Sequence, residues 1–357
     1  MSDKKEGLFL RLLMPLDERV SVKLLLRVWG PRFEFVVRLI LVATFLDDSL
    51  RTATHFFDHT KQVAEQGCLQ WLAPSSPDLA GVIATVALGN GLIAQALGSV
   101  CLLALVQPDG ATKALIGWAV AQPVLYAQLA NVEFVAESLS LVGGLLMLRA
   151  HLLAEQAKKD DLASGGLRAP GAAARAAISR TQLLGRLLLP TYYLYHAGLL
   201  LLSVATPETT DSASSFVASL STTVVNAAVL VGLVLGCALV AAGLKSRTVA
   251  LSLALVNLAF VCYQYPFYRF AWLEGGVWKY DEAGMRKSMP QFEGVDGIEA
   301  SRSEPFEPWQ IYDLNRYYFF QGLSASGALL LLAQFGPGKI AVEENEVILP
   351  VMQRAQD

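Results

Sequence analysis

Charged side chains interrupt the apolar segment 33–52 near its ends, and two of them are adjacent carboxylates, Asp47 and Asp48. Charges within a membrane span are costly and usually face a bundle interior or a wet cavity. A carboxylate in a partly dehydrated cleft binds an ammonium group through a charge-assisted hydrogen bond. Arg51 lies one helical turn away, so an internal ion pair that stabilises the helix end is the competing hypothesis.

A second acidic pair, Glu133 and Glu137, is spaced four residues apart and therefore shares one helix face. Like charges at this spacing repel, so they need a cation, water or an exposed rim. We predict that they form one acidic pocket with Asp47 and Asp48. The alternative is a solvated helix start, where carboxylates favour the positive end of the helix dipole.

Motifs for metal binding and catalysis are weak in this chain. His55 and His59 have the spacing of a helical metal-binding pair, but the remaining histidines, His151 and His196, offer no matched second pair. The four cysteines form no CxxC motif, and no GxSxG, P-loop or GxGxxG signature occurs. We therefore expect no metal, no cofactor and no enzymatic activity. The net charge of −3 gives no indication of nucleic-acid binding.

The composition is that of a membrane protein, with 54% hydrophobic and only 17% charged residues and a mean hydropathy of +0.44. Stretches of about 20 apolar residues predict an all-α polytopic bundle of about eight spans. The predicted spans are 33–51, 79–106, 112–130, 133–152, 183–205, 216–243, 247–268 and 315–335. Lys and Arg concentrate in alternate connections, which predicts that both termini are cytosolic.

The predicted organisation is two four-helix halves, 33–152 and 183–338, with a long lumenal loop over 271–312 in the second half. The segment 153–182 is expected to be a flexible cytosolic linker. A cytosolic N-terminal segment over 1–32 and a cytosolic tail over 339–357 complete the chain.

A weak internal repeat supports two halves. LSLVGGLLML at 139–148 resembles LSASGALLLL at 323–332, and the sequences that follow Arg38 and Arg186 also match. Repeats of this kind commonly place a site at their interface, although Gly- and Leu-rich spans also resemble each other by composition alone. We expect Arg38 and Arg186 to pair with Glu34 or to extend toward lipid phosphates.

Four motifs resemble the Surfeit locus protein 4 family: TFLDDSLR at 44–51, GGLLML at 143–148, YDLNRYYFFQGLS at 312–324 and FGPG at 335–338. This resemblance implies a DoxX-like fold and a cargo receptor of the endoplasmic reticulum that loads soluble lumenal proteins into COPII vesicles and cycles through the early Golgi. The implied partners are secretory cargo, COPII coat components and membrane lipids, and a homo-oligomer is compatible with this picture. Asp313, Arg316 and Tyr317 match the family pattern, which implies a structural role at a lumenal vestibule. Glu133 and Glu137 lie where animal members tend to have basic residues.

Two other functions fit a charged, Gly-rich polytopic chain. A lipid scramblase or small-solute transporter also uses repeated membrane halves. A DoxX-like membrane oxidoreductase subunit would need a quinone or redox cofactor, which the dispersed cysteines and histidines support poorly.

Overall fold

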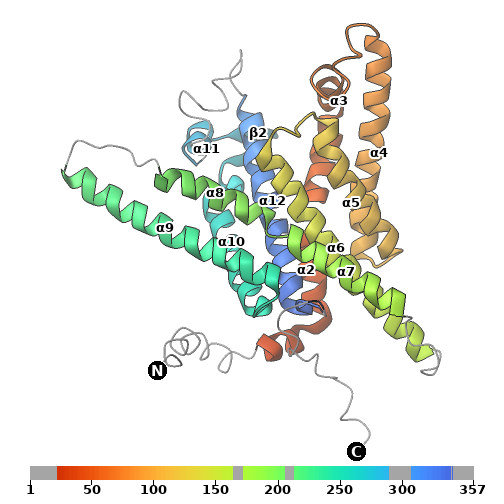
Figure 1. Ribbon diagram of the computed structural model, residues 1–357. Helices are drawn as coiled ribbons and strands as arrows, with labels where there is room; N and C mark the ends of the chain where they lie inside the picture. The colour runs from red at the N-terminus through yellow and green to blue at the C-terminus, as the bar shows by residue number, and fades with distance from the viewer. Residues whose placement is uncertain (1–21, 164–171, 206–212, 289–306, 339, 341–357) are drawn as a thin grey trace, which may run out of the picture.

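The computed structural model describes residues 22–163, 172–205, 213–288, 307–338 and 340. Within these ranges helices joined by turns make up most of the chain, one β-hairpin is the exception, and the all-α polytopic prediction is confirmed (Figure 1). The helices are α2 (Val22–Thr54), α3 (Phe56–Glu65), α4 (Pro77–Leu103), α5 (Pro108–Leu125), α6 (Val132–Ala163), α7 (Ala172–Leu188), α8 (Thr191–Ala205), α9 (Ala213–Ala242), α10 (Ser246–Gln264), α11 (Glu282–Ser288) and α12 (Pro308–Phe335).

Helix α12 is the centre of the bundle and packs against α2, α6 and α10. The start of α2 and the end of α12 lie at the same end of the molecule (Figure 1), and the cytosolic location of both termini stays a prediction. Small residues permit the close approach, because a Cβ atom on Gly144 of α6 would lie 2.6 Å from the Ala328 Cβ of α12. The buried side chains around this contact include Leu41, Leu145 and Leu329.

One pair of contacts reproduces the internal repeat in three dimensions. A Cβ atom on Gly143 would lie 2.5 Å from the backbone nitrogen of Leu189, and one on Gly327 would lie 2.7 Å from that of Leu41. Gly143 and Gly327 are equivalent in the repeat, and so are Leu189 and Leu41. The same helix contact therefore occurs twice, although the division of the chain into two halves stays a prediction.

Four described helical segments are long and apolar enough to cross a bilayer, Pro77–Leu103, Thr223–Ala242, Ser246–Arg269 and Pro308–Phe335. The count of eight spans stays a prediction. The structure contradicts one of the predicted spans, 183–205. The segment 183–205 is not one helix, because the chain breaks at Pro190 between α7 and α8. Proline lacks the N–H of a continuous helix and its ring clashes with the preceding turn. The 15 residues of α8 reach only about 22 Å.

The linker expected over 153–182 is also largely wrong. Helix α6 continues to Ala163 and α7 begins at Ala172, so only 164–171 lies outside the described residues here. The segment is rich in Ala, Leu, Glu, Lys and Arg, which are strong helix formers. Its Ala and Arg content was better evidence for a helix than for flexibility.

The two repeat-equivalent arginines behave differently. Arg38 lies 3.9 Å from Glu34, as expected for an ion pair. Arg186 is only 2% exposed and donates hydrogen bonds of 2.7 Å each to the carbonyls of Pro337 and Ile340. The expectation that Arg186 extends toward lipid is therefore wrong, because backbone carbonyls after α12 bind both terminal nitrogens of its buried guanidinium.

The segment 271–312 carries ordered structure at both ends. Strands β1 (Ala271–Glu274) and β2 (Val277–Tyr280) form an antiparallel hairpin whose turn residues, Gly275 and Gly276, have positive φ angles of 62° and 81°. Helix α11 follows, and residues 289–306 lie outside the described chain. The hairpin and α11 lie beside the N-terminal end of α12 (Figure 1).

Candidate functional site

The first acidic pair is ion-paired inside the bundle. Asp47 lies 2.7 Å from Arg316 on α12, and Asp48 lies 2.6 Å from Arg51 on its own helix. Asp47 and Asp48 are 8% and 6% exposed. Gln122 of α5 adds a hydrogen bond of 3.2 Å from its Nε2 to Asp48 Oδ2. Both carboxylates thus have guanidinium partners, which is the internal ion-pair arrangement that the sequence left open.

A cavity opens beside these pairs at the end of the bundle where α2 ends and α6 begins. It offers about 200 Å³ to water-sized molecules and draws its walls from α2, α3, α5, α6, α12 and the turn before α6. We call it the main cavity. Its lining residues are Arg51, His59, Gln62, Gln122, Tyr126, Gln128, Asn131, Glu133, Phe134, Glu137, Leu314, Tyr317 and Tyr318.

Two carboxylates in the main cavity lack a cation. Glu137 accepts a hydrogen bond of 3.1 Å from the Tyr317 hydroxyl, and Glu133 accepts a longer one of 3.5 Å from Tyr195. Neither has an ion pair with any residue in the described part of the chain. The third charge on the cavity wall, Arg51, is already balanced by Asp48. A buried carboxylate without a cation is costly, so the cavity favours a cationic ligand or a proton.

The turn between α5 and α6 explains how the two glutamates reach the cavity. Asn131 precedes α6, and its side-chain oxygen accepts a hydrogen bond of 3.3 Å from the Phe134 backbone N–H. This cap begins α6 directly before Glu133, and the spacing of four residues then places Glu137 one turn deeper on the same face. The depth differs accordingly, since Glu137 is only 3% exposed and Glu133 is half-buried.

Aromatic rings give the main cavity an apolar side. Tyr317 also lies under the Arg51 guanidinium, whose carbon is 5.6 Å from the ring centre. Tyr318 stacks on Tyr265 of the loop after α10, with ring centres 5.4 Å apart. With Phe134 and Leu314, these rings provide apolar contact beside the two carboxylates. The site can therefore hold a short segment that carries a cation next to an apolar side chain.

The structure thus divides the predicted site residues. Arg51, Glu133, Glu137 and Tyr317 line the main cavity, whereas Asp47 does not. Asp48 lies behind the cavity wall and holds Arg51 there. Arg316 contacts Asp47 and lies 3.9 Å from Asp313. The four carboxylates do not line one pocket as predicted, because only Glu133 and Glu137 line the main cavity, whereas Asp47 and Asp48 are ion-paired with Arg316 and Arg51.

The sequence missed most of the aromatic and amide side chains of the site, including Tyr126, Tyr318, Phe134 and Gln122. Isolated tyrosines near the ends of membrane spans usually belong to interfacial belts. Nothing in their spacing distinguishes a cavity wall from such a belt. A weak signal existed only in the run of aromatic residues that contains Tyr317 and Tyr318.

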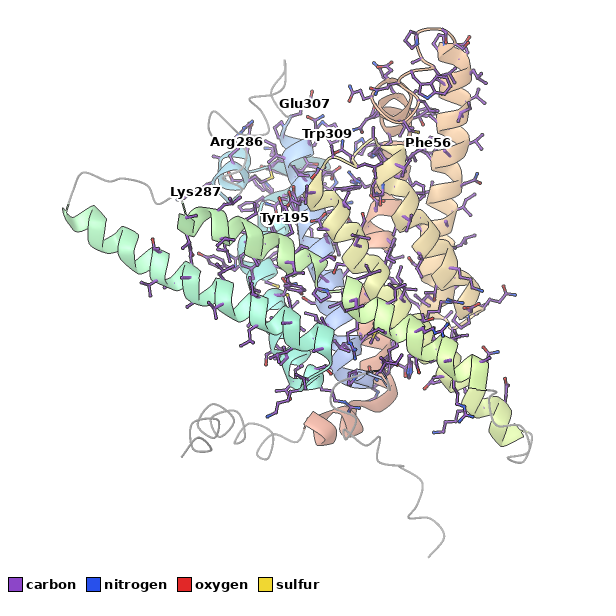
Figure 2. All side chains as sticks on the ribbon, viewed as in Figure 1. Phe56, Tyr195, Arg286, Lys287, Glu307 and Trp309 are labelled. Carbon is purple, nitrogen blue, oxygen red and sulfur yellow. The ribbon has the colours of Figure 1, made fainter. Side chains whose placement is uncertain are left out.

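The paired histidines do not converge on a metal site. The His59 ring lies 3.3 Å from the Tyr126 hydroxyl, while His55 stacks on Trp309 with ring centres 4.5 Å apart. Figure 2 shows Trp309 at the end of the molecule that also carries Phe56. Burial, followed by the charge of Arg51, lowers the pKa of His59 to about 4, so this ring is neutral at physiological pH.

The sequence pattern of the SURF4 family matches residues 22–272, more than half of the chain. The chain belongs to the SURF4 family. The match covers Asp47, Asp48, Arg51, Glu133 and Glu137 and ends before α12. The 312–324 motif that also resembles the family thus lies outside the matched residues. No curated protein and no solved structure matches the chain significantly.

Proposed function

We propose that this SURF4 family member is a cargo receptor of the endoplasmic reticulum, which binds soluble secretory proteins on the lumenal side and loads them into COPII vesicles. Membership of the family supports a receptor of this kind at the family level. The proposal includes cycling through the early Golgi and cytosolic termini. It assigns no enzymatic step to the chain.

The observation that carries the proposal is the pair of carboxylates, Glu133 and Glu137, that face the main cavity without a cation. The N-terminus of a processed cargo protein supplies an ammonium group, which would form charge-assisted hydrogen bonds with them. The first cargo side chains would then pack on Phe134, Leu314 and Tyr318. Cargo would be selected by these apolar contacts, since every free N-terminus carries the same charge.

The other partners follow from the predicted topology. The positive charge of these connections predicts that segments 1–32 and 149–182 are cytosolic, and there they would contact coat components. The tail 339–357 would do the same, and most of it lies outside the described residues. Membrane lipids would surround the exposed apolar faces of α4, α9 and α10.

Peptide binding to the purified protein in lipid nanodiscs tests the proposal. A peptide with a free N-terminus and an apolar first residue should bind, and N-acetylation should weaken binding by roughly 10- to 100-fold, the value of a charge-assisted hydrogen bond of about 1.5–3 kcal/mol. Glu137→Gln should weaken binding of the peptide with a free N-terminus by a similar factor. In the Glu137→Gln variant, N-acetylation of the peptide should reduce the affinity only slightly further, because the carboxylate that binds the ammonium group is gone.

Glu155→Gln is the matched control, since Glu155 lies on the same helix at the opposite end of the bundle. It should bind both peptides as the wild type does. Equal affinity of the wild type for free and acetylated peptides would contradict the site. Transfer of labelled lipid between the leaflets of cargo-free vesicles would favour the scramblase instead.

A further inference from the structure

Gln95 of α4 is a fully buried amide with no partner. Its exposed fraction is 0%, and neither its Oε1 nor its Nε2 forms a hydrogen bond within the described part of the chain. It lies inside a predicted membrane span, where no bulk water compensates for the lost hydrogen bonds. Buried side-chain amides normally satisfy at least one of their polar atoms. Something outside the protein chain is therefore expected beside it.

A small compartment lies next to this amide. It provides about 10 Å³, and polar side chains from five helices line it, among them Thr44, Asp48, Gln95, Gln122 and Gln321. Gln122 and Tyr317 line both this compartment and the main cavity, so the compartment lies directly behind the cavity wall. A volume of about 10–15 Å³ accommodates one water molecule.

The partners already present determine which ligand fits. Asp48 is paired with Arg51 at 2.6 Å, so the compartment carries no unbalanced charge that would attract a cation. Gln321 Oε1 already accepts a hydrogen bond of 2.9 Å from the Thr44 hydroxyl. Gln95 in contrast offers both a free donor and a free acceptor. A ligand of this size that both donates and accepts hydrogen bonds is water.

We propose that this compartment is a binding site for a single water molecule, which bridges the Gln95 amide and the Asp48 carboxylate. The water connects α4 to the ion pair that holds Arg51 at the wall of the main cavity. It also provides Asp48 with a hydrogen-bond donor in addition to Arg51 and Gln122. The inference concerns the bundle interior and does not depend on which ligand the main cavity binds.

Gln95→Met tests the proposal because methionine has nearly the same shape and no amide. If water occupies the compartment, the substitution removes its partner and leaves polar groups unsatisfied, so Tm in nanodiscs should fall by about 2–4 °C. If the compartment is dry, the same substitution removes two unsatisfied polar atoms and Tm should rise. A rise would overturn the proposal.

Ser99→Ala is the matched control. Ser99 lies one turn further along α4, is 0% exposed and has an unpartnered hydroxyl, but it does not line the compartment. Its removal should leave Tm unchanged or raise it. Should Gln95→Met fail to fold, cryo-electron microscopy of the wild type decides the question. One resolved water peak within hydrogen-bond distance of Gln95 and Asp48 would support the site, and an empty compartment would contradict it.

Discussion

The Tyr317 hydroxyl donates a hydrogen bond of 3.1 Å to the Glu137 carboxylate, joining α12 to α6 across the main cavity. This contact places the deeper of the two cation-free carboxylates in a fixed orientation. The same ring lies under Arg51, 5.6 Å from its guanidinium carbon, so Tyr317 contacts both a carboxylate and a cation of the cavity wall. We therefore expect Tyr317 to position Glu137, in addition to the structural role at the vestibule that the family resemblance implies.

Tyr317→Phe should weaken binding of a peptide with a free N-terminus by roughly 5- to 10-fold, because about 1 kcal/mol of hydrogen bonding is lost at Glu137. The ring remains, so Tm should change little. Tyr312→Phe is the control, since Tyr312 is on the same helix but outside the cavity, where it packs on Phe267 and Tyr280. Titration of both variants in nanodiscs checks this, and equal affinities would contradict the positioning role.

The pair Asp47–Arg316 should act mainly on stability. Asp47→Asn leaves a half-buried arginine without its nearest carboxylate, and removal of one partner from a buried ion pair typically costs about 3–5 kcal/mol. Arg316→Met added to Asp47→Asn should recover part of that loss, because the guanidinium that Asp47 neutralised is then gone; recovery is incomplete because Asp313 also loses Arg316, which lies 3.9 Å away. Chemical unfolding of the two single variants and the double variant measures the coupling. Additive losses would show that the two side chains do not interact.

The sequence predicted the charged residues of the site better than their partners. Charges at the rims of apolar segments correctly indicated that Asp47, Asp48, Glu133 and Glu137 gather near one end of the bundle. Which arginine neutralises which carboxylate depends on contacts between distant parts of the chain, as between Asp47 and Arg316. Short-range spacing found the pair Asp48–Arg51 but could not show that Glu133 and Glu137 stay without a cation.

The fold shows the same difference between local and distant information. Hydrophobic length located most helices, and the repeat in the sequence anticipated the doubled glycine contact. Pro190 was read as part of a span, although its missing N–H gave a local reason to expect a break. The unpartnered amide of Gln95 could not be predicted, because its environment comes from five helices.

The doubled helix contact predicts paired effects of alanine. Gly143→Ala and Gly327→Ala should each destabilise the protein by about 1–3 kcal/mol, because the added methyl group meets backbone atoms that cannot rotate away. Gly232→Ala is the control, since nothing lies within 4 Å of its Cβ position. That substitution should be neutral or stabilising by up to about 1 kcal/mol. Thermal unfolding compares the three variants, and unchanged stability of Gly143→Ala or Gly327→Ala would contradict the close contact.

His59 predicts a pH dependence of stability. Its pKa is lowered by burial to about 4 in the folded protein, against about 6.5 when unfolded, so the unfolded chain binds more protons between these values. The stabilisation is fully present above pH 6.5 and is lost as the pH falls toward 4, by roughly 2 kcal/mol between pH 6.5 and 5. His59→Gln keeps a polar partner for the Tyr126 hydroxyl without titrating. The Tm of the variant should therefore fall less than that of the wild type between pH 7.5 and pH 5.

His55→Gln is the control for this prediction, since His55 stacks on Trp309 outside the cavity. An unchanged pH profile in His59→Gln would mean that other groups set the acid sensitivity.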